Sequence, residues 1–341
     1  MIVTPERQFS AADVSSYGDD YLLGYRDGVD GLVDKLLKKG SSVARQSESE
    51  PAAALGDMAG SQPFTYGVNM VGAATSPFSG DGARVAILDS GIDFSHPAFA
   101  GRIADSAFFI GSSAHDGNPF SHGTHCAGTA CGPQVSNAPE ATRFGVAYDA
   151  ELYIGKVLPD SGFGGASIYQ GMQWAIDKKC HVISMSIQSD SSQVYPDYDL
   201  YGQRALNAGC LVVAAAGNNA SRPNSFGFVA APANALTIIA VGGIDRNFNM
   251  YSRSGRSNGV DGGNIDLAGP GVAVYSSIRG GYGRLDGTSM ATPHVAGVAA
   301  LWHQKTGATG VGLALALYQS VKSLSLDSRD VGKGLVQAPQ S

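Results

Sequence analysis

The chain has 341 residues, of which 43% are hydrophobic and 15% charged, and its net charge of −6 reflects 23 basic against 29 acidic side chains. This length and composition predict a folded protein with a sizeable core and exclude a disordered one. The sequence has no basic stripe to attract a nucleic acid, and no apolar stretch approaches the roughly 20 residues that span a membrane.

The N-terminal region differs in composition from the rest of the chain. Residues 1–63 are polar and end in a Ser/Glu/Ala-rich linker at 41–63, with an expected strand at 21–25 and a short helix at 29–40. The first residues lack the hydrophobic core of a secretory signal, so the sequence leaves two locations open: the cytoplasm, or export with the signal removed. We expect an N-terminal extension at 1–63 followed by one folded domain at 64–341.

Short apolar runs alternate with helical patterns from residue 64 onward. Strands are expected at 83–89, 150–158, 181–187, 210–217 and 235–243, and helices at 122–130, 167–179 and 199–208. Strands that are apolar on both faces and separated by helices are typical of a parallel sheet covered on both sides. The predicted fold class is therefore α/β, with a doubly wound parallel sheet flanked by helices.

The four cysteines are too few for a disulfide scaffold in a chain of this size. Cys126 and Cys131 fall five residues apart in one expected helix, so their side chains diverge. Cys180 and Cys210 each precede an apolar strand and could lie near one another. None of the four has the paired spacing of a zinc site, and we expect free, mostly buried thiols.

The stretch GTSMATPHVAG at 287–297 predicts the start of a helix that is rich in small residues. A proline near the first turn breaks few hydrogen bonds, because the first four N–H groups of a helix lack internal partners. Thr288 or Ser289 is expected to be the N-cap residue. A buried helix with a hydroxyl cap explains this pattern, but it leaves open whether Ser289 does more than cap.

Four polar side chains stand at the ends of predicted elements, where parallel α/β sheets collect their chemistry. Asp89 ends the first strand and Asn218 follows the fourth, while His122 and Ser289 each open a helix. A hydroxyl nucleophile, an imidazole base, a carboxylate that orients the base and an amide that stabilises an oxyanion are the groups of acyl transfer. The N–H of Ser289 would lie at a helix N-terminus, where the helix dipole favours developing negative charge.

Four motifs in this order resemble the subtilisin family of serine endopeptidases: DSGID at 89–93, HGTHCAGT at 122–129, AAAGN at 214–218 and GTSMATPHVAG at 287–297. The similarity runs from about residue 66 to 338, and HGTHCAG resembles the proteinase K side of the family. The resemblance implies a subtilisin-like fold and a hydrolase that cleaves polypeptides through an acyl-enzyme and requires no cofactor. It also implies that Asp89, His122 and Ser289 are the catalytic residues, with Asn218 as the oxyanion donor.

Other histidines and other catalytic arrangements compete with this assignment. The Ser, acid, His order of α/β-hydrolases is excluded, because no acid lies between Ser289 and His294 or His303. His125 lies one turn from His122 and could act as the base, but the first His of the motif matches the base of the family. Asp93 is expected to be structural, and the remaining histidines are expected to be structural or surface residues. The alternative functions are a catalytically silent subtilase fold that binds a partner and a peptide-processing transpeptidase.

The expected substrate-binding residues depart from the family pattern at one position. An extended peptide is expected to pair with backbone at GFGG, residues 162–165, and to place its P1 side chain in a small apolar pocket. By resemblance, the substrate-binding residues are Gly162, Phe163, Gly164, Ser186, Ile187, Gln188, Ala215 and Gly217. Gln188 and Ser189 stand where many subtilases carry Gly-Gly, and a side chain at 188 would narrow the pocket or make it more polar. The sequence therefore predicts a narrower specificity than that of scavenging subtilases.

Expectations about calcium and about the N-terminal region depend on the resemblance alone. A structural calcium ion is compatible with the family, but Ala98 stands where relatives often carry an acidic ligand, and residues 131–145 lack the usual calcium-loop pattern. No metal ligand is assigned. Residues 1–63 resemble part of a shortened inhibitory propeptide, which implies intramolecular inhibition, and a linker is the alternative.

Overall fold

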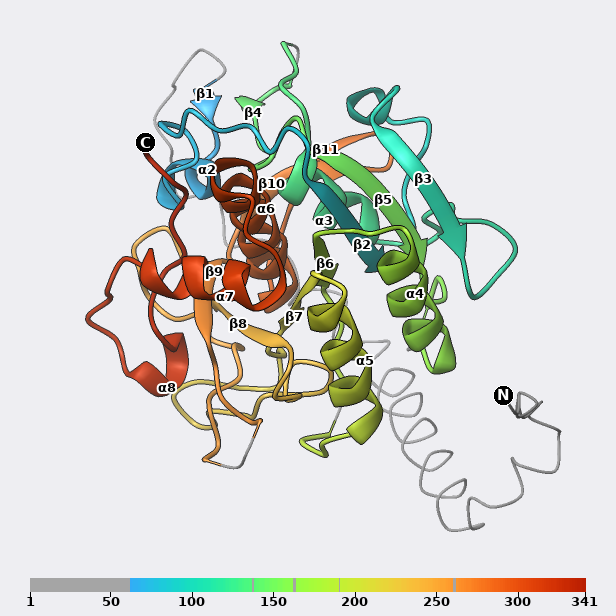
Figure 1. The fold of residues 1–341 in the computed structure, drawn as a ribbon. Helices are drawn as coiled ribbons and strands as arrows, with labels where there is room; N and C mark the ends of the chain where they lie inside the picture. Colours follow the sequence, from blue (N-terminus) through green and yellow to red (C-terminus); the bar gives the residue numbers. More distant parts are fainter. Residues whose placement is uncertain (1–61, 137, 162–163, 190, 260–261) are drawn as a thin grey trace, which may run out of the picture. The chain divides into compact units, whose positions relative to one another are not determined.

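A seven-stranded parallel sheet forms the centre of the protein, in the strand order β3-β5-β2-β6-β7-β8-β9 (Figure 1). The computed structural model describes residues 62–136, 138–161, 164–189, 191–259 and 262–341. The strands of the sheet are β2 (Arg84–Asp89), β3 (Ile103–Phe108), β5 (Glu151–Lys156), β6 (Val182–Met185), β7 (Leu211–Ala215), β8 (Ile239–Ile244) and β9 (Leu267–Pro270).

The direction in which the sheet grows reverses beside β2. The chain builds β3 and β5 on one side of β2, and then crosses to the other side to build β6, β7, β8 and β9. In open parallel sheets, ligands bind beyond the carboxyl ends of the strands at such a reversal. Asp89 is the last residue of β2 and therefore lies at this edge of the sheet.

The predicted fold class is confirmed, and the five strands predicted from apolar runs correspond to β2, β5, β6, β7 and β8 with shifted ends. The two edge strands, β3 and β9, are missing from the prediction. Along β3, half-buried residues alternate with exposed ones, and β9 is a run of only four residues that contains Gly269 and Pro270. Neither strand produces the long apolar run that marks a strand buried on both faces.

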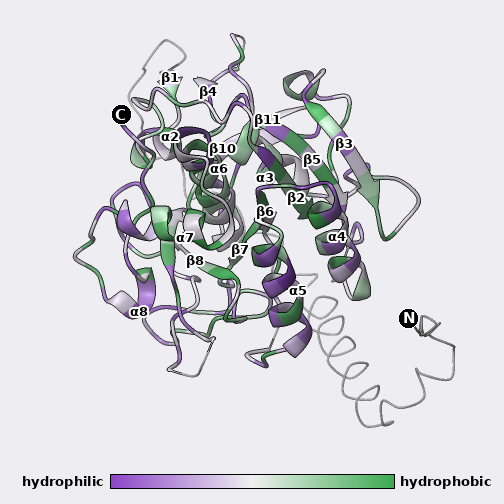
Figure 2. Cartoon of the chain, viewed as in Figure 1, coloured by the Kyte–Doolittle hydropathy of each residue, from purple (hydrophilic) through white to green (hydrophobic). Residues whose placement is uncertain are grey.

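Helices cover both faces of the sheet (Figure 1). The helices are α3 (His122–Cys131) and α6 (Thr288–Thr306) on one face, and α4 (Ala166–Asp177) and α5 (Pro196–Asn207) on the other. Alternate residues of β2 enter two separate cores: Val85 and Ile87 pack with α3 and α6, whereas Ala86 and Leu88 pack with α4 and α5. Figure 2 shows hydrophilic residues on the side of α5 that faces the viewer, away from the sheet.

The smaller elements of this part of the chain pack around the sheet and its helices. The smaller elements of the described residues are β1 (Gln62–Phe64), α2 (Tyr66–Met70), η2 (Pro97–Phe99), β4 (Ala141–Arg143), β10 (Val274–Ile278), β11 (Gly281–Leu285), α7 (Gly310–Gln319) and α8 (Ser328–Val331). The hairpin of β10 and β11 packs beside α3, and β1 pairs in parallel with β4. The domain boundary predicted at 63/64 falls inside β1, and the elements predicted within 1–61 lie outside the described residues.

The start of α6 corrects one prediction. The N-cap residue is Gly287, and helix α6 begins at Thr288, so neither Thr288 nor Ser289 is the cap. The Asn218 side chain provides the capping hydrogen bond instead, because its Oδ1 accepts from the Thr288 N–H at 2.9 Å. An amide that reaches the helix from a different segment cannot be recognised in the local sequence of the helix.

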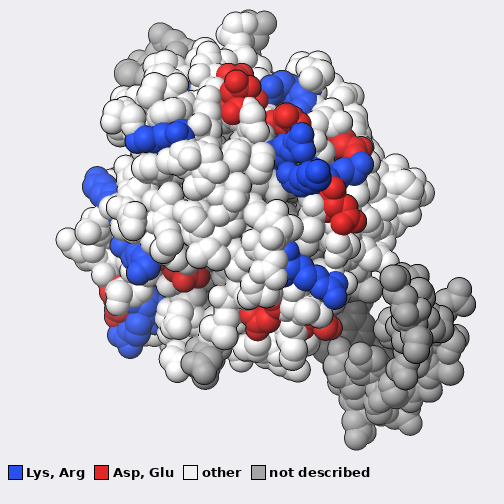
Figure 3. Space-filling view, in the orientation of Figure 1, with Lys and Arg blue, Asp and Glu red and all other residues white. Residues whose placement is uncertain are grey.

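The four cysteines are all buried and free, as the sequence predicts. On the face shown in Figure 3, Lys and Arg side chains are interspersed with Asp and Glu and do not gather in one stripe. Within the described ranges, no helix is both long and apolar enough to cross a membrane.

Candidate active site

Buried Asp89 at the end of β2 pairs with half-buried His122 at the start of α3. The Nδ1 atom of His122 lies 2.8 Å from Oδ1 of Asp89, and the Asp89 side chain is 1% exposed. Oδ1 also accepts the N–H of Ser90 at 2.7 Å. Because the Asp89 carboxylate accepts a hydrogen bond from Nδ1–H of His122, Nε2 is the ring nitrogen that can accept another proton.

The electrostatic surroundings of His122 favour its protonated form. Burial on its own lowers the pKa of the imidazole, but the Asp89 carboxylate, with a smaller contribution from Cys126, raises the pKa well above its ordinary value. A carboxylate within hydrogen-bonding distance stabilises the imidazolium that forms when a histidine accepts a proton.

Ser289 lies in the first turn of α6 and opens onto the same cavity as His122. Its Oγ donates a long hydrogen bond, 3.5 Å, to the carbonyl oxygen of Ser186. This partner is a backbone carbonyl and not His122; without substrate, the hydrogen bond from a nucleophilic hydroxyl to its base is often long or poorly aligned and tightens on binding. The cavity has a volume of about 350 Å³ and is lined by Asn118, His122, Leu158, Ser186, Ile187, Gln188, Asn218, Tyr251, Arg253, Asp286 and Ser289.

Pro293 lies within α6, and it changes the partners of the Ser289 backbone. Because proline has no N–H, the carbonyl of Ser289, four residues earlier, loses its usual helical hydrogen bond. That carbonyl accepts instead from Oγ of Ser186 at 2.6 Å and from Sγ of Cys126 at 3.6 Å. The proline in GTSMATP thus leaves the Ser289 carbonyl free to bind Ser186, the residue after β6, and Cys126 of α3.

Asn218 is oriented by the same helix start. Its Oδ1 accepts from both the N–H and the hydroxyl of Thr288, at 2.9 and 3.1 Å, so its Nδ2 group is the end that can donate. A Cβ atom added at Gly287 would lie 3.5 Å from Asn218 Nδ2 and 3.5 Å from the Ser289 backbone nitrogen. The Asn218 amide and the backbone nitrogen of Ser289 therefore both lie close to Gly287.

Gln188 is among the residues that line the cavity. Its Oε1 accepts a hydrogen bond from the backbone N–H of Asn218 at 2.5 Å, and a Cβ at Gly217 would lie 3.7 Å from the same oxygen. Among the other predicted substrate-binding residues, Ser186 and Ile187 line the cavity, whereas Gly164, Ala215 and Gly217 are not among its lining residues. The prediction for Gly162 and Phe163 lies outside the described residues.

The competing histidine lies deeper in the fold. Nε2 of His125 contacts the Val274 carbonyl at 2.8 Å, and burial lowers the pKa of His125 to about 3. His125 does not line the described part of the cavity, so its position favours a structural role. The position of Asp93 also favours a structural role, because its Oδ1 accepts hydrogen bonds from the N–H and the hydroxyl of Ser95 in the same loop.

The cavity wall also contains four polar or charged residues that the sequence does not predict: Asn118, Tyr251, Arg253 and Asp286. Asn118 lies in the loop before α3, Tyr251 and Arg253 lie in the loop after β8, and Asp286 directly follows β11. None of them belongs to a quoted motif, although Asp286 immediately precedes GTSMATPHVAG. Among the described residues, one group of three could hold a metal ion, and it consists of Asp89, His122 and Cys126. A structural calcium ion stays a prediction without assigned ligands.

Comparisons with known proteins agree with this geometry. The model of the subtilase family matches residues 80–326. The chain is 42% identical to the thermostable alkaline protease of Halalkalibacterium halodurans over 248 residues, which cover 71% of this chain and 63% of that protein. It is 38% identical to subtilisin Savinase of Lederbergia lenta over 285 residues, which cover 81% of this chain and 98% of that protein.

A solved structure, that of sphericase, matches with a TM-score of 0.68 and 29% sequence identity, and the match covers 80% of this chain and 97% of that one. The chain spans less than two thirds of the alkaline protease but nearly all of Savinase. The family match, the relatives and the shared architecture lead to one conclusion: the chain belongs to the subtilase family of subtilisin-like serine proteases.

Proposed function

We propose that the protein is a serine endopeptidase in which Ser289 attacks the peptide carbonyl, His122 takes its proton and Asp89 orients the imidazole. The observation that carries this proposal is the 2.8 Å bond between His122 and Asp89, at the wall of a cavity that Ser289 also lines. The Asp…His…Ser chain order is that of subtilisin. Attack would give an acyl-enzyme, which water then hydrolyses after the amine leaves.

The oxyanion formed in each step would be bound by Asn218 and by the N–H of Ser289. Support comes from the Thr288 hydrogen bonds that fix Asn218 Oδ1 and leave Nδ2 as the donor, and from the position of both nitrogens near Gly287. Donors that are fixed before reaction need little reorganisation as charge develops, and loss of one costs about 10²–10³ in kcat, a figure taken from the relative subtilisin.

The substrate would be an extended polypeptide segment that pairs with backbone at 162–165 and at 186–188. Gln188 would make the P1 pocket narrower and more polar than glycine does, so small or polar P1 residues are favoured. Residues 1–63 would act as an inhibitory segment of the same chain, although a simple linker is the alternative.

A fluorophosphonate probe tests the proposed nucleophile directly. We expect one equivalent of label per chain, located on Ser289 by peptide mass spectrometry, and no label on the Ser289→Ala variant. Absence of label on the folded wild-type chain would favour a catalytically silent fold that only binds peptides. Accumulation of ligated rather than hydrolysed peptides by a labelled enzyme would favour the transpeptidase alternative.

A further inference from the structure

Ser90 forms hydrogen bonds with Asp89 and with the residue that follows His122. Its N–H donates to Oδ1 of Asp89 at 2.7 Å, and its Oγ accepts the N–H of Gly123, the residue after His122, at 3.0 Å. Ser90 itself is 0% exposed. One buried residue therefore connects the end of β2 with the first turn of α3.

Asp116 holds this arrangement from the loop before α3. Its Oδ1 accepts from Ser90 Oγ at 2.9 Å and from the Asn118 N–H at 3.1 Å. Its Oδ2 accepts from the N–H of Thr124 at 2.9 Å and from the Thr124 hydroxyl at 2.6 Å. Asp116 is 0% exposed, so one buried carboxylate with four hydrogen bonds ties the strand that carries Asp89 to the helix that carries His122.

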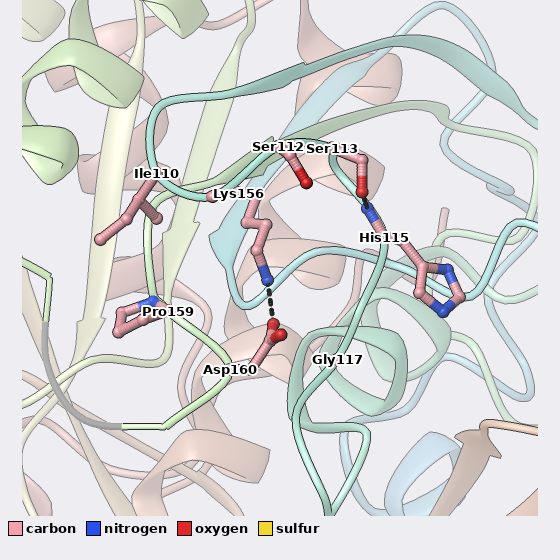
Figure 4. Close-up of a pocket in the computed structure, with 9 residues that line it drawn as sticks. Ile110, Ser112, Ser113, His115, Gly117, Lys156, Pro159 and Asp160 are labelled. Carbon is pink, nitrogen blue, oxygen red and sulfur yellow. Dashed lines mark hydrogen bonds and ion pairs between the residues drawn. The ribbon is translucent and has the colours of Figure 1, made fainter.

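Lys156 holds the other side of Ser90 from the end of β5. Its Nζ donates to the Ser90 carbonyl at 2.6 Å and to Oδ1 of Asp160 at 2.7 Å. Figure 4 shows the Lys156 side chain pointing to Asp160 beside a cavity of about 310 Å³. The carbonyl, the hydroxyl and the N–H of Ser90 are thus all fixed, each by a different partner.

The strand end and the helix start have little space to shift. A Cβ atom at Gly123 would lie 2.2 Å from the Gly91 carbonyl oxygen and 3.1 Å from Ser90 Oγ, so the two backbones are already in close contact. In such a site, the hydroxyl of Ser90 has one position in which it both donates to Asp116 and accepts from Gly123.

We infer that Ser90 and Asp116 are positioning residues that set the angle and distance of the Asp89–His122 hydrogen bond. The inference deepens the proposed function and depends on it. Neither side chain is among the described residues that line the substrate cavity, so neither is expected to contact substrate. Misplacement of a catalytic group by about 1 Å can cost about 10²-fold in rate, which sets the scale of the expected effect.

The test compares Ser90→Ala and Asp116→Asn with a matched buried serine. Ser184→Ala is the control, because Ser184 is buried in β6 and its Oγ has no hydrogen-bond partner among the described residues. We expect kcat to fall about 10- to 10²-fold in the two test variants with KM changed less than about twofold, and no change in the control. Circular dichroism and urea unfolding give the folded fraction to which kcat is normalised.

Two further readouts separate positioning from mere stabilisation. A weaker Asp89–His122 bond lowers the pKa of His122, so the acid limb of kcat/KM shifts to lower pH in both test variants. In a His122→Ala background, where there is no imidazole left to position, Ser90→Ala should cause no further loss of kcat.

The inference is overturned if the acid limb stays in place while kcat per folded molecule falls, or if Ser90→Ala costs as much without His122 as with it. Wild-type kcat in both test variants would overturn it as well. Failure of the proposed function itself would look different, because Ser289→Ala would then retain activity whatever the state of Ser90.

Discussion

At the scale of single residues, Gln188 is the side chain that most directly shapes specificity. Its amide lies in the cavity wall, where its oxygen accepts the Asn218 N–H at 2.5 Å. A bulky apolar P1 group would clash with the side chain and bury its amide nitrogen without a partner, at a cost of about 1–3 kcal/mol.

We therefore predict that Gln188→Gly raises kcat/KM for Phe or Leu at P1 by about tenfold or more, since 1.4 kcal/mol is one decade. A P1 peptide library assayed on both forms measures this. Ser189→Gly is a suitable control, because Ser189 is not among the described residues that line the cavity. A wild-type enzyme that already prefers Phe or Leu, with an unchanged profile in Gln188→Gly, would contradict the prediction.

The raised pKa of His122 predicts an alkaline activity profile. The base must be neutral to accept the Ser289 proton, and the Asp89 carboxylate raises the pKa of His122 well above its ordinary value against the effect of burial. Activity should therefore fall as pH drops through a pKa above about 6.5. The acid limb of kcat/KM, measured with a substrate that does not titrate, reports this value. An acid limb at or below pH 6 would contradict the prediction that the Asp89 carboxylate raises the pKa of His122.

At the scale of elements, the packing of α3 against α6 buries two neutral histidines. Burial lowers the pKa of His125 in α3 to about 3, and it lowers the pKa of His294 in α6 to about 4. Nδ1 of His294 contacts the Met290 carbonyl at 2.8 Å, and a Cβ at Gly67 would lie 2.2 Å from its Nε2. The folded state therefore keeps these imidazoles neutral where the unfolded chain protonates them.

In the unfolded chain these histidines have a pKa of about 6.5 and bind protons below that pH. Their contribution to the free energy of unfolding is therefore present above pH 6.5 and is lost as pH falls toward 4. We predict that His294→Asn, which keeps a donor near the Met290 carbonyl, removes about 2 kcal/mol of the loss between pH 7 and pH 5. Urea unfolding of both forms, in a Ser289→Ala background to prevent autolysis, measures the difference. Parallel curves of stability against pH would show that His294 titrates equally in both states.

The same elements show what a sequence can and cannot reveal. Strands β2, β5, β6, β7 and β8 are predictable because they are buried on both faces, whereas β3 alternates with solvent and escapes the pattern. The prediction of Asp89, His122, Asn218 and Ser289 depends on their positions at element ends, because parallel α/β sheets gather such ends at one edge. The cap of α6 was assigned wrongly because Asn218, 70 residues away in sequence, supplies it. Asp116 lies in a loop without periodicity, so its bonds to Ser90 and Thr124 become visible only in three dimensions.

At the scale of the whole molecule, the N-terminal region offers a prediction about regulation. If residues 1–63 inhibit the domain that follows, a chain that begins near Gln62 should be more active than the full chain. A separate 1–63 peptide should then inhibit it in trans, whereas a scrambled peptide of the same composition should not. Initial rates measured at several peptide concentrations give the inhibition constant. Equal activity of both forms, with no inhibition by the peptide, would reduce the region to a linker.

The central claim is that a serine nucleophile at position 289 carries the chemistry of the whole domain, and one measurement tests it most directly. That measurement is the kcat of Ser289→Ala on a peptide substrate, with circular dichroism to confirm an unchanged fold. We predict a loss on the order of 10⁶, the value known from the relative subtilisin, because the attacking oxygen is gone while the oxyanion donors stay in place. A variant that kept even a tenth of the wild-type turnover would contradict the account.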